Sequence, residues 1–292
     1  MTILIQCLVS GISIGAIYTM IALSYTILFG TLRVANFAQG DIYMIAILVG
    51  YTFYVNAALP FPVALVLSIV AAIIVLLFIE RTIYTPVQKS SSMYLFICTI
   101  GMATFLRNGA QLIFGSESYA FPPLFNNVPI EILPGVSILS QNIAIIIVAV
   151  ILVVALMLFM RKTKVGLAMT SMSMNPYAAS IMGVNLKKIT TLTYGISAAI
   201  VAIAGVFSAP IYNVNTTVGA GIGLKALIAA VLGGFGNPVG AILGGVLLGL
   251  IEALGSTYLS SAYKDAFSFI ALLIILFLRP QGILGRKNIT KV

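Results

Sequence analysis

Long apolar runs fill most of the chain, and short linkers between them hold most of the polar and charged residues. None of the runs alternates apolar and polar residues with a period of two, so we expect α-helices rather than the strands of a β-barrel. A helix needs about 20 apolar residues to cross a bilayer. Seven runs are long enough: 4–29, 41–59, 61–79, 93–114, 138–160, 191–212 and 259–278.

An eighth apolar stretch, 224–254, is interrupted by the sequence GGFGNPVG at 233–240. Four glycines and a proline at this place are expected to break a helix. The part before the break, 225–232, is too short to cross at about 1.5 Å of rise per residue. We therefore predict a broken, re-entrant hairpin, which lies either beside a permeation path or at a tight corner of helix packing. The predicted break consists of Gly233, Gly234, Gly236, Asn237 and Pro238.

Composition agrees with a protein embedded in a membrane. Of the 292 residues, 61% are hydrophobic and only 7% are charged, whereas about 25% of an ordinary soluble domain is charged. We predict an all-α integral membrane protein with about eight hydrophobic helical segments, folded as a single transmembrane domain over 1–292. Three pairs of glycines four residues apart predict close helix packing within the chain: Gly11 with Gly15, Gly240 with Gly244, and Gly245 with Gly249.

The basic residues predict how the chain is oriented. The net charge is +9, but the cations are spread over short linkers, which favours a role in membrane orientation over nucleic-acid binding. If the basic stretch 161–188 is cytoplasmic, counting crossings places the N-terminus outside and the C-terminus in the cytoplasm. Twelve of the 15 basic residues then face the cytoplasm: Arg33, Arg81, Lys89, Arg161, Lys162, Lys164, Lys187, Lys188, Arg279, Arg286, Lys287 and Lys291.

The sequence offers little catalytic chemistry. It contains no G-x-x-x-x-G-K-[ST] motif and no histidine, so nucleotide binding by a P-loop is excluded and an enzyme is not expected. The six carboxylates are scattered, and Cys7 and Cys98 lie in apolar runs, so we predict no cofactor and no metal site. Three basic residues stay outside the cytoplasmic set: Arg107, Lys225 and Lys264. Arg107 either reaches the membrane surface with its long side chain or lines an outer vestibule, and Lys225 and Glu252 carry the same two interpretations.

Two kinds of sequence block resemble a known family of transporters. The run NPYAASIMGVN at 175–185 resembles the EAA-type loop of ABC importer permeases, with Tyr177 where many relatives have glutamate. The blocks SGISIGAIYTMIALSYTILFGTLRVANFAQGD at 10–41 and LKALIAAVLGGFGNPVGAILGGVLLGLIEAL at 224–254 are similar to those of branched-chain amino acid permeases, in particular the H-type subunit. The first block departs from the family at Gln39, where relatives commonly carry histidine, so we expect hydrogen bonding or packing there in place of protonation.

The resemblance implies how energy reaches the membrane domain. Residues 161–190 would form a cytoplasmic coupling loop whose short helix begins at Asn175 and Pro176 and ends at Gly183. The predicted coupling residues are Asn175, Ala178, Ala179, Gly183, Asn185, Lys187 and Lys188. Asn36, Gln39 and Asp41 are predicted, together with the break residues, to line or gate the translocation path. Helix termination alone would also explain these polar residues.

The implied assembly is an ABC importer of the second structural type in the cytoplasmic (inner) membrane. It would contain a second permease subunit, two ATP-binding subunits and an extracytoplasmic solute-binding protein, and it would carry branched-chain or related amino acids. A permease for urea or short amides in the same family is one alternative. An ion-coupled secondary transporter is another, although neither clear inverted repeats nor a cluster of coupling carboxylates is visible. A channel is disfavoured because no filter motif stands out.

Overall fold

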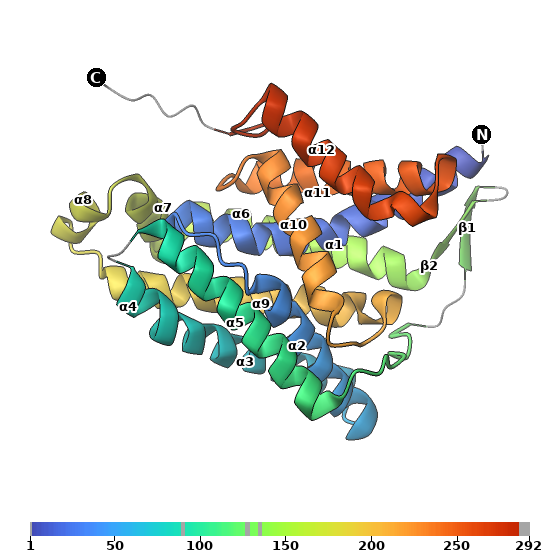
Figure 1. The fold of residues 1–292 in the computed structure, drawn as a ribbon, viewed down its shortest axis with the longest axis horizontal. Helices are drawn as coiled ribbons and strands as arrows, with labels where there is room; N and C mark the ends of the chain where they lie inside the picture. The colour runs from blue at the N-terminus through green and yellow to red at the C-terminus, as the bar shows by residue number, and fades with distance from the viewer. Residues whose placement is uncertain (1, 89–90, 126–128, 134–135, 286–292) are drawn as a thin grey trace.

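A computed structural model describes residues 2–88, 91–125, 129–133 and 136–285. Its helices form one bundle, and a two-stranded antiparallel sheet lies at the end of the bundle that also holds the N-terminus (Figure 1). The longer helices are α1 (Thr2–Leu32), α3 (Phe61–Ile79), α5 (Ser92–Phe114), α6 (Ser140–Lys162), α9 (Leu186–Tyr212) and α11 (Pro238–Tyr258). The shorter helices are α2 (Gln39–Tyr51), α4 (Thr85–Val87), α7 (Lys164–Met174), α8 (Pro176–Ile181), α10 (Val218–Gly233) and α12 (Lys264–Leu278).

The predicted membrane-embedded helical fold is confirmed. Within the described residues, six helical stretches are long and apolar enough to cross a membrane: Thr2–Leu32, Phe61–Val87, Ser140–Lys162, Leu186–Tyr212, Pro238–Tyr258 and Ser261–Leu278. Two π-helical turns, Thr52–Asn56 and Glu80–Tyr84, extend α2 and α3. The all-α prediction missed the small hairpin of β1 (Pro129–Leu133) and β2 (Val136–Leu139), because β1 belongs to a proline-containing loop and the end of β2 belongs to the predicted helical run 138–160.

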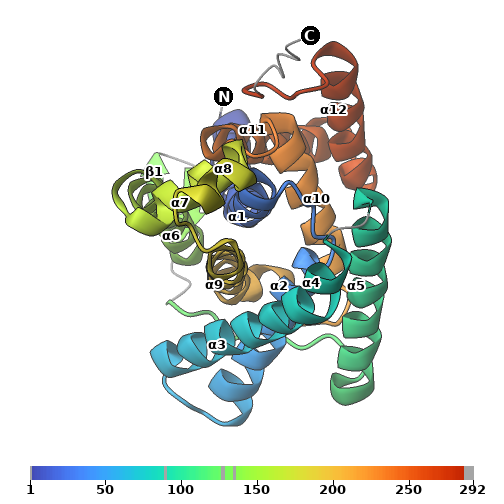
Figure 2. The same ribbon diagram turned by 90° about the vertical axis from the view of Figure 1, so that its left-hand side faces the viewer.

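Close glycine contacts hold α11 antiparallel along α1 near the centre of the bundle (Figure 2). A methyl group placed on Gly15 would lie 2.9 Å from the carbonyl oxygen of Gly245, and one placed on Gly11 would lie 3.1 Å from the Cβ of Ala253. At the other end of α1, Gly30 approaches Gly236. The prediction that these glycines serve packing within the chain is therefore confirmed, since any larger side chain would push the two backbones apart.

The eighth apolar stretch forms a helical hairpin that is broken where the sequence predicts. Gly234 and Gly236 have φ angles of 110° and 91°, which favour glycine, and α11 then runs back antiparallel to α10. The first arm is longer than the predicted 225–232, because α10 begins at Val218 and has 16 residues, or about 24 Å of length. The glycines at its start bring α10 onto α2: a methyl group on Gly223 would lie 2.5 Å from the Cα of Gly40.

Some predicted features lie outside the described residues. Among the cations assigned to the cytoplasmic side, this holds for Lys89, Arg286, Lys287 and Lys291.

Candidate functional site

Short capping interactions shape the loop that carries the predicted coupling residues. Asn175 Oδ1 accepts a hydrogen bond of 3.1 Å from the backbone N–H of Ala178, and Pro176 opens α8. At the other end Gly183 has a φ of 86°, and the N–H of Val184 donates to the carbonyl of Ala179 at 3.0 Å. Residues 175–185 thus form a compact unit, which we call the α8 knob.

The α8 knob projects from the end of the bundle opposite the N-terminus (Figure 1). Of its side chains Ala179 is buried, whereas Tyr177, Ile181 and Met182 are 76%, 68% and 84% exposed. Asn185 caps α9 by accepting a 3.1 Å hydrogen bond from the N–H of Lys188. The predicted coupling residues are therefore gathered at one end of the bundle, next to exposed cations that have no ion pair within the described part of the chain: Arg161, Lys162, Lys164, Lys187 and Lys188.

Gln39 lies in a buried polar cluster at the start of α2. Its Nε2 donates to Ser24 Oγ of α1 at 3.0 Å and to Ser197 Oγ of α9 at 2.8 Å. Both serine hydroxyls donate to backbone carbonyls, those of Ile21 and Ser24, which fixes the amide nitrogen of Gln39 on their side. Gln39 Oε1 then has no hydrogen-bond partner among the described residues. The two serines were missed from the sequence, where only their polarity within apolar runs distinguishes them.

Asn36 and Asp41 lie on either side of Gln39 along the chain, and both side chains are buried. Asn36 Oδ1 accepts from the N–H of Ala38 at 3.1 Å, but its Nδ2 finds no partner in the described structure. Asp41 forms two hydrogen bonds with Arg107 of α5, from Nε at 3.0 Å and from Nη2 at 3.3 Å. In this conformation the three predicted path residues are enclosed by protein.

The other two cations outside the cytoplasmic set meet at a second buried carboxylate. Glu252 of α11 is completely buried, and it pairs with Lys225 of α10 at 2.8 Å and with Lys264 of α12 at 3.1 Å. Tyr18 of α1 donates to the same carboxylate at 2.7 Å, and Lys225 also pairs with Asp265 at 2.7 Å. The three cations that the sequence left unassigned are thus all used within the protein, where they join neighbouring helices.

The break between α10 and α11 is a tightly packed corner. Asn237 Oδ1 accepts from the N–H groups of Val239 and Gly240, while its Nδ2 donates to the carbonyl of Leu284 at 2.9 Å. The N–H of Leu284 in turn bonds to the carbonyl of Gly233 at 2.9 Å. A side chain on Gly233 or Gly234 would overlap neighbouring backbone atoms, and Pro238 starts α11. These five residues accordingly satisfy the backbone of the break and fit the packing interpretation.

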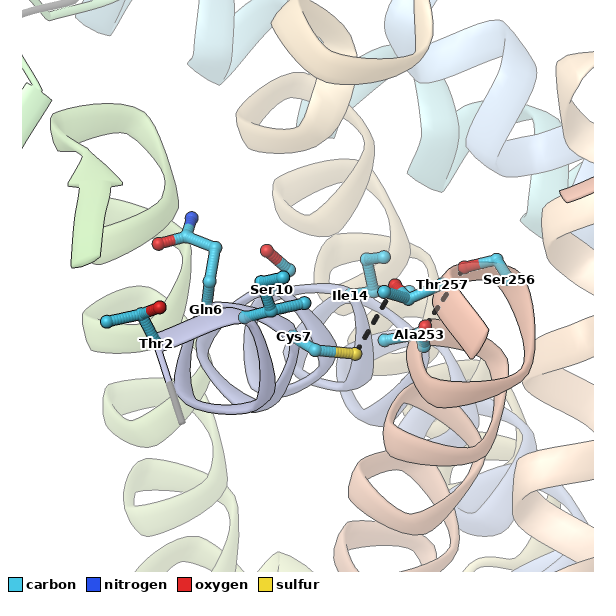
Figure 3. Close-up of a pocket in the computed structure, with 9 residues that line it drawn as sticks. Thr2, Gln6, Cys7, Ser10, Ile14, Ala253, Ser256 and Thr257 are labelled. Carbon is cyan, nitrogen blue, oxygen red and sulfur yellow. Dashed lines mark hydrogen bonds between the residues drawn. The ribbon is translucent and has the colours of Figure 1, made fainter. Parts of the chain in front are cut away.

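A separate cavity of about 300 Å³ lies between the N-terminal part of α1 and the C-terminal part of α11 (Figure 3). Cys7 donates to Thr257 Oγ1 across it at 3.5 Å. The remaining lining residues are all uncharged: Thr2, Ile3, Gln6, Ser10, Ile14, Ala253 and Ser256. None of the residues that the sequence predicts for the path or for coupling lines this cavity.

Comparison with known proteins identifies the family. Residues 7–276 match the family described as "Branched-chain amino acid transport system / permease component". The permease protein LivH of a high-affinity branched-chain amino acid transport system in Salmonella typhimurium is 37% identical, over 99% of this chain and 97% of LivH. BraD, the corresponding protein of Pseudomonas aeruginosa, is 34% identical over 99% of this chain and 98% of its own length. A probable LivH of Methanocaldococcus jannaschii is 26% identical over 91% of this chain and 88% of its own. The chain belongs to the permease family of branched-chain amino acid transport systems.

Proposed function

We propose that the chain is the permease subunit of an ABC importer for branched-chain amino acids, and that separate ATP-hydrolysing subunits dock on its α8 knob. The observation that supports the docking step is the exposed apolar surface of the knob: Tyr177 and Ile181 lie on the short helix α8, and Met182 follows directly at its end. A cluster of apolar side chains exposed to water marks a surface that another protein covers. The full-length similarity to LivH and BraD supports the branched-chain amino acids as solute.

Helix α9 connects the knob to the polar cluster. It begins at Leu186, directly after the knob, and carries Ser197, which holds the Gln39 amide. The distance along the helix from Asn185 to Ser197 is about 18 Å. A displacement of the knob by a closing ATPase would therefore reach Gln39 through one continuous helix. In our proposal this motion opens the enclosed cluster, and the unpaired Oε1 of Gln39 and Nδ2 of Asn36 become available to the passing amino acid.

The proposed assembly contains a second permease subunit, two ATP-binding subunits and an extracytoplasmic solute-binding protein. The chain would cross the inner membrane several times with its N-terminus outside and its C-terminus in the cytoplasm, so that the α8 knob and its cations face the ATPases. Lys187 and Lys188 lie beside the knob, where they could pair with acidic groups of the ATPase. ATP hydrolysis would belong to the partner subunits.

Co-purification tests the docking site. The tagged chain is expressed with its neighbouring gene products, and the variant Tyr177→Ser/Met182→Ser removes apolar surface without touching buried residues. We expect the ATPase subunit to be recovered with the wild type and lost, at least in large part, from this variant and from Ala179→Glu. Gly195→Ala, on α9 and with no atom near the added methyl group, serves as the matched control and retains the ATPase.

Transport by the reconstituted assembly tests the solute. Uptake of labelled leucine that depends on ATP supports the proposal. If the assembly takes up urea but not leucine, the chain is a permease for urea or short amides instead. If no ATPase binds and the chain alone moves solute into liposomes, the proposal is wrong and the ion-coupled transporter takes its place.

A further inference from the structure

The ion pair between Asp41 and Arg107 lies well inside the bundle. The linker 33–38 turns back along α1, so that α2 begins inside the bundle and not at its end (Figure 1). Gln39 bonds there to Ser24, which lies eight residues, or about 12 Å, before the end of α1. Only 2% of the Asp41 side chain is exposed. An ionised group at such depth in a membrane domain is costly, and it indicates a functional site.

This ion pair is held by fewer partners than the charges around Glu252. The Glu252 carboxylate contacts two lysines and a tyrosine from three other helices, whereas within the described residues Asp41 pairs with no cation other than Arg107. The guanidinium uses only Nε and Nη2 in this contact, and 33% of its side chain is exposed. Rotation of one side chain, that of Arg107, is therefore enough to separate the two charges.

A solute that carries both charges can replace each partner of the pair. An α-amino acid is a zwitterion: its carboxylate fits the two parallel N–H groups of a guanidinium, and its ammonium group donates to a carboxylate. Without such a solute, separation of Asp41 from Arg107 leaves two uncompensated charges inside the protein. With the solute between them, two ion pairs replace one and the net charge stays zero. The exchange favours zwitterions over solutes with a single charge or none.

Unpaired amide atoms beside the pair suit the same solute. Asn36 Nδ2 and Gln39 Oε1 are buried and have no hydrogen-bond partner among the described residues. Both residues lie within five positions of Asp41 in the chain. Buried polar atoms without a partner are rare in folded proteins. One of these atoms is a donor for a carboxylate and the other is an acceptor for an ammonium group, which indicates a polar ligand with both groups.

We infer that Asp41 and Arg107 recognise the charged groups of the amino acid during its passage. Arg107 binds the α-carboxylate and Asp41 binds the α-ammonium group, after their own ion pair has opened. This inference rests on the proposed function, which supplies the amino acid and the ATP-driven opening of the cluster. It adds a selection for zwitterions inside the membrane domain, after the extracytoplasmic solute-binding protein has delivered its solute. Urea carries no charge with which to replace either partner.

The amount of leucine transported per ATP hydrolysed tests the inference. It is measured in proteoliposomes that contain the complete transporter, with the solute-binding protein loaded with leucine. Asp41→Leu/Arg107→Met replaces the pair by apolar side chains and leaves no charge unpaired. We expect this variant to assemble, to unfold at a temperature no lower than the wild type, and to hydrolyse ATP. It should move at least about tenfold less leucine per ATP, the loss that corresponds to one charge-assisted hydrogen bond.

Arg107→Lys is a second variant, which keeps the positive charge next to Asp41. Lysine does not form the two parallel bonds of a guanidinium, so leucine transport per ATP should fall several-fold while the unfolding temperature changes little. Asp265→Asn is the control, because it removes a carboxylate from the exposed part of the other charge cluster. It should keep the wild-type ratio of leucine to ATP.

A wild-type ratio in the apolar double variant would show that the pair only joins α2 to α5, and the inference would be wrong. If the double variant does not assemble, Arg107→Lys decides: an unchanged ratio contradicts the inference, and a several-fold loss at unchanged stability supports it. An equal loss in Asp265→Asn would indicate general uncoupling and would also count against it. If the wild-type transporter shows no ATP-dependent leucine uptake, the proposed function fails; if it does and the variants match it, only this inference fails.

Discussion

At the residue scale, the side chain of Glu252 joins four helices. It belongs to α11, accepts a hydrogen bond from Tyr18 of α1, and pairs with Lys225 of α10 and Lys264 of α12. Removing one partner of a buried ion pair leaves the other charge uncompensated and costs about 3 to 5 kcal/mol. We therefore expect Glu252→Gln to lower the free energy of unfolding by about 3 kcal/mol, measured by thermal unfolding of the purified chain in detergent.

Asp265 offers the matched control, because its side chain pairs with the same Lys225 but is 75% exposed. Asp265→Asn should cost less than about 1 kcal/mol, and a Glu252→Gln variant as stable as the wild type would show that the cluster does not hold the helices.

The sequence identifies each of these charges but not their pairing. Lys225 and Glu252 are 27 residues apart, and Asp41 and Arg107 are 66 apart, so only the folded bundle decides which charges meet.

At the element scale, two glycines of α10 have different roles, because one is packed against α2 and the other is not. A methyl group on Gly223 would lie 2.5 Å from the Cα of Gly40, whereas one on Gly221, two residues earlier in the same helix, would meet no atom within 4 Å. Gly223→Ala should therefore push α10 away from α2 and cost about 1 to 3 kcal/mol. Gly221→Ala should be neutral or slightly stabilising, because alanine favours helix. Thermal unfolding of both variants in detergent measures the difference.

Equal losses of stability for the two variants would mean that the close approach of α10 and α2 is not maintained.

The same helix shows which features the sequence alone does not predict. Apolar runs predict that helices exist and where most of them lie, and Asn175 and Gly183 predict the ends of α8 because capping is local. The start of α10 at Val218 escaped prediction, since its glycines are poor helix formers that become favourable only against Gly40 of another helix.

At the scale of the whole molecule, the threading of the chain can be tested directly. With Cys7 and Cys98 replaced, single cysteines at Glu117 and at Lys162 are treated with a membrane-impermeant maleimide; both positions are exposed, and the helix α6 lies between them in the chain. We expect Glu117→Cys to be labelled in intact cells and Lys162→Cys only after the inner membrane is opened. This pattern corresponds to an outer β1–β2 end and a cytoplasmic α8 end.

The opposite labelling pattern would place the α8 knob outside the cell, where no ATPase can reach it, and would contradict the proposed coupling even if the fold is unchanged. Labelling of both positions from one side would instead mean that α6 does not cross, against its 23 residues of apolar helix. The test is decisive because orientation depends on the cations of the linkers, whereas helix packing depends on glycines and buried ion pairs inside the bundle. Reversing linker charges, for example Arg161→Glu/Lys162→Glu/Lys164→Glu, should consequently reduce the fraction of correctly oriented chains without altering the contacts between α1 and α11.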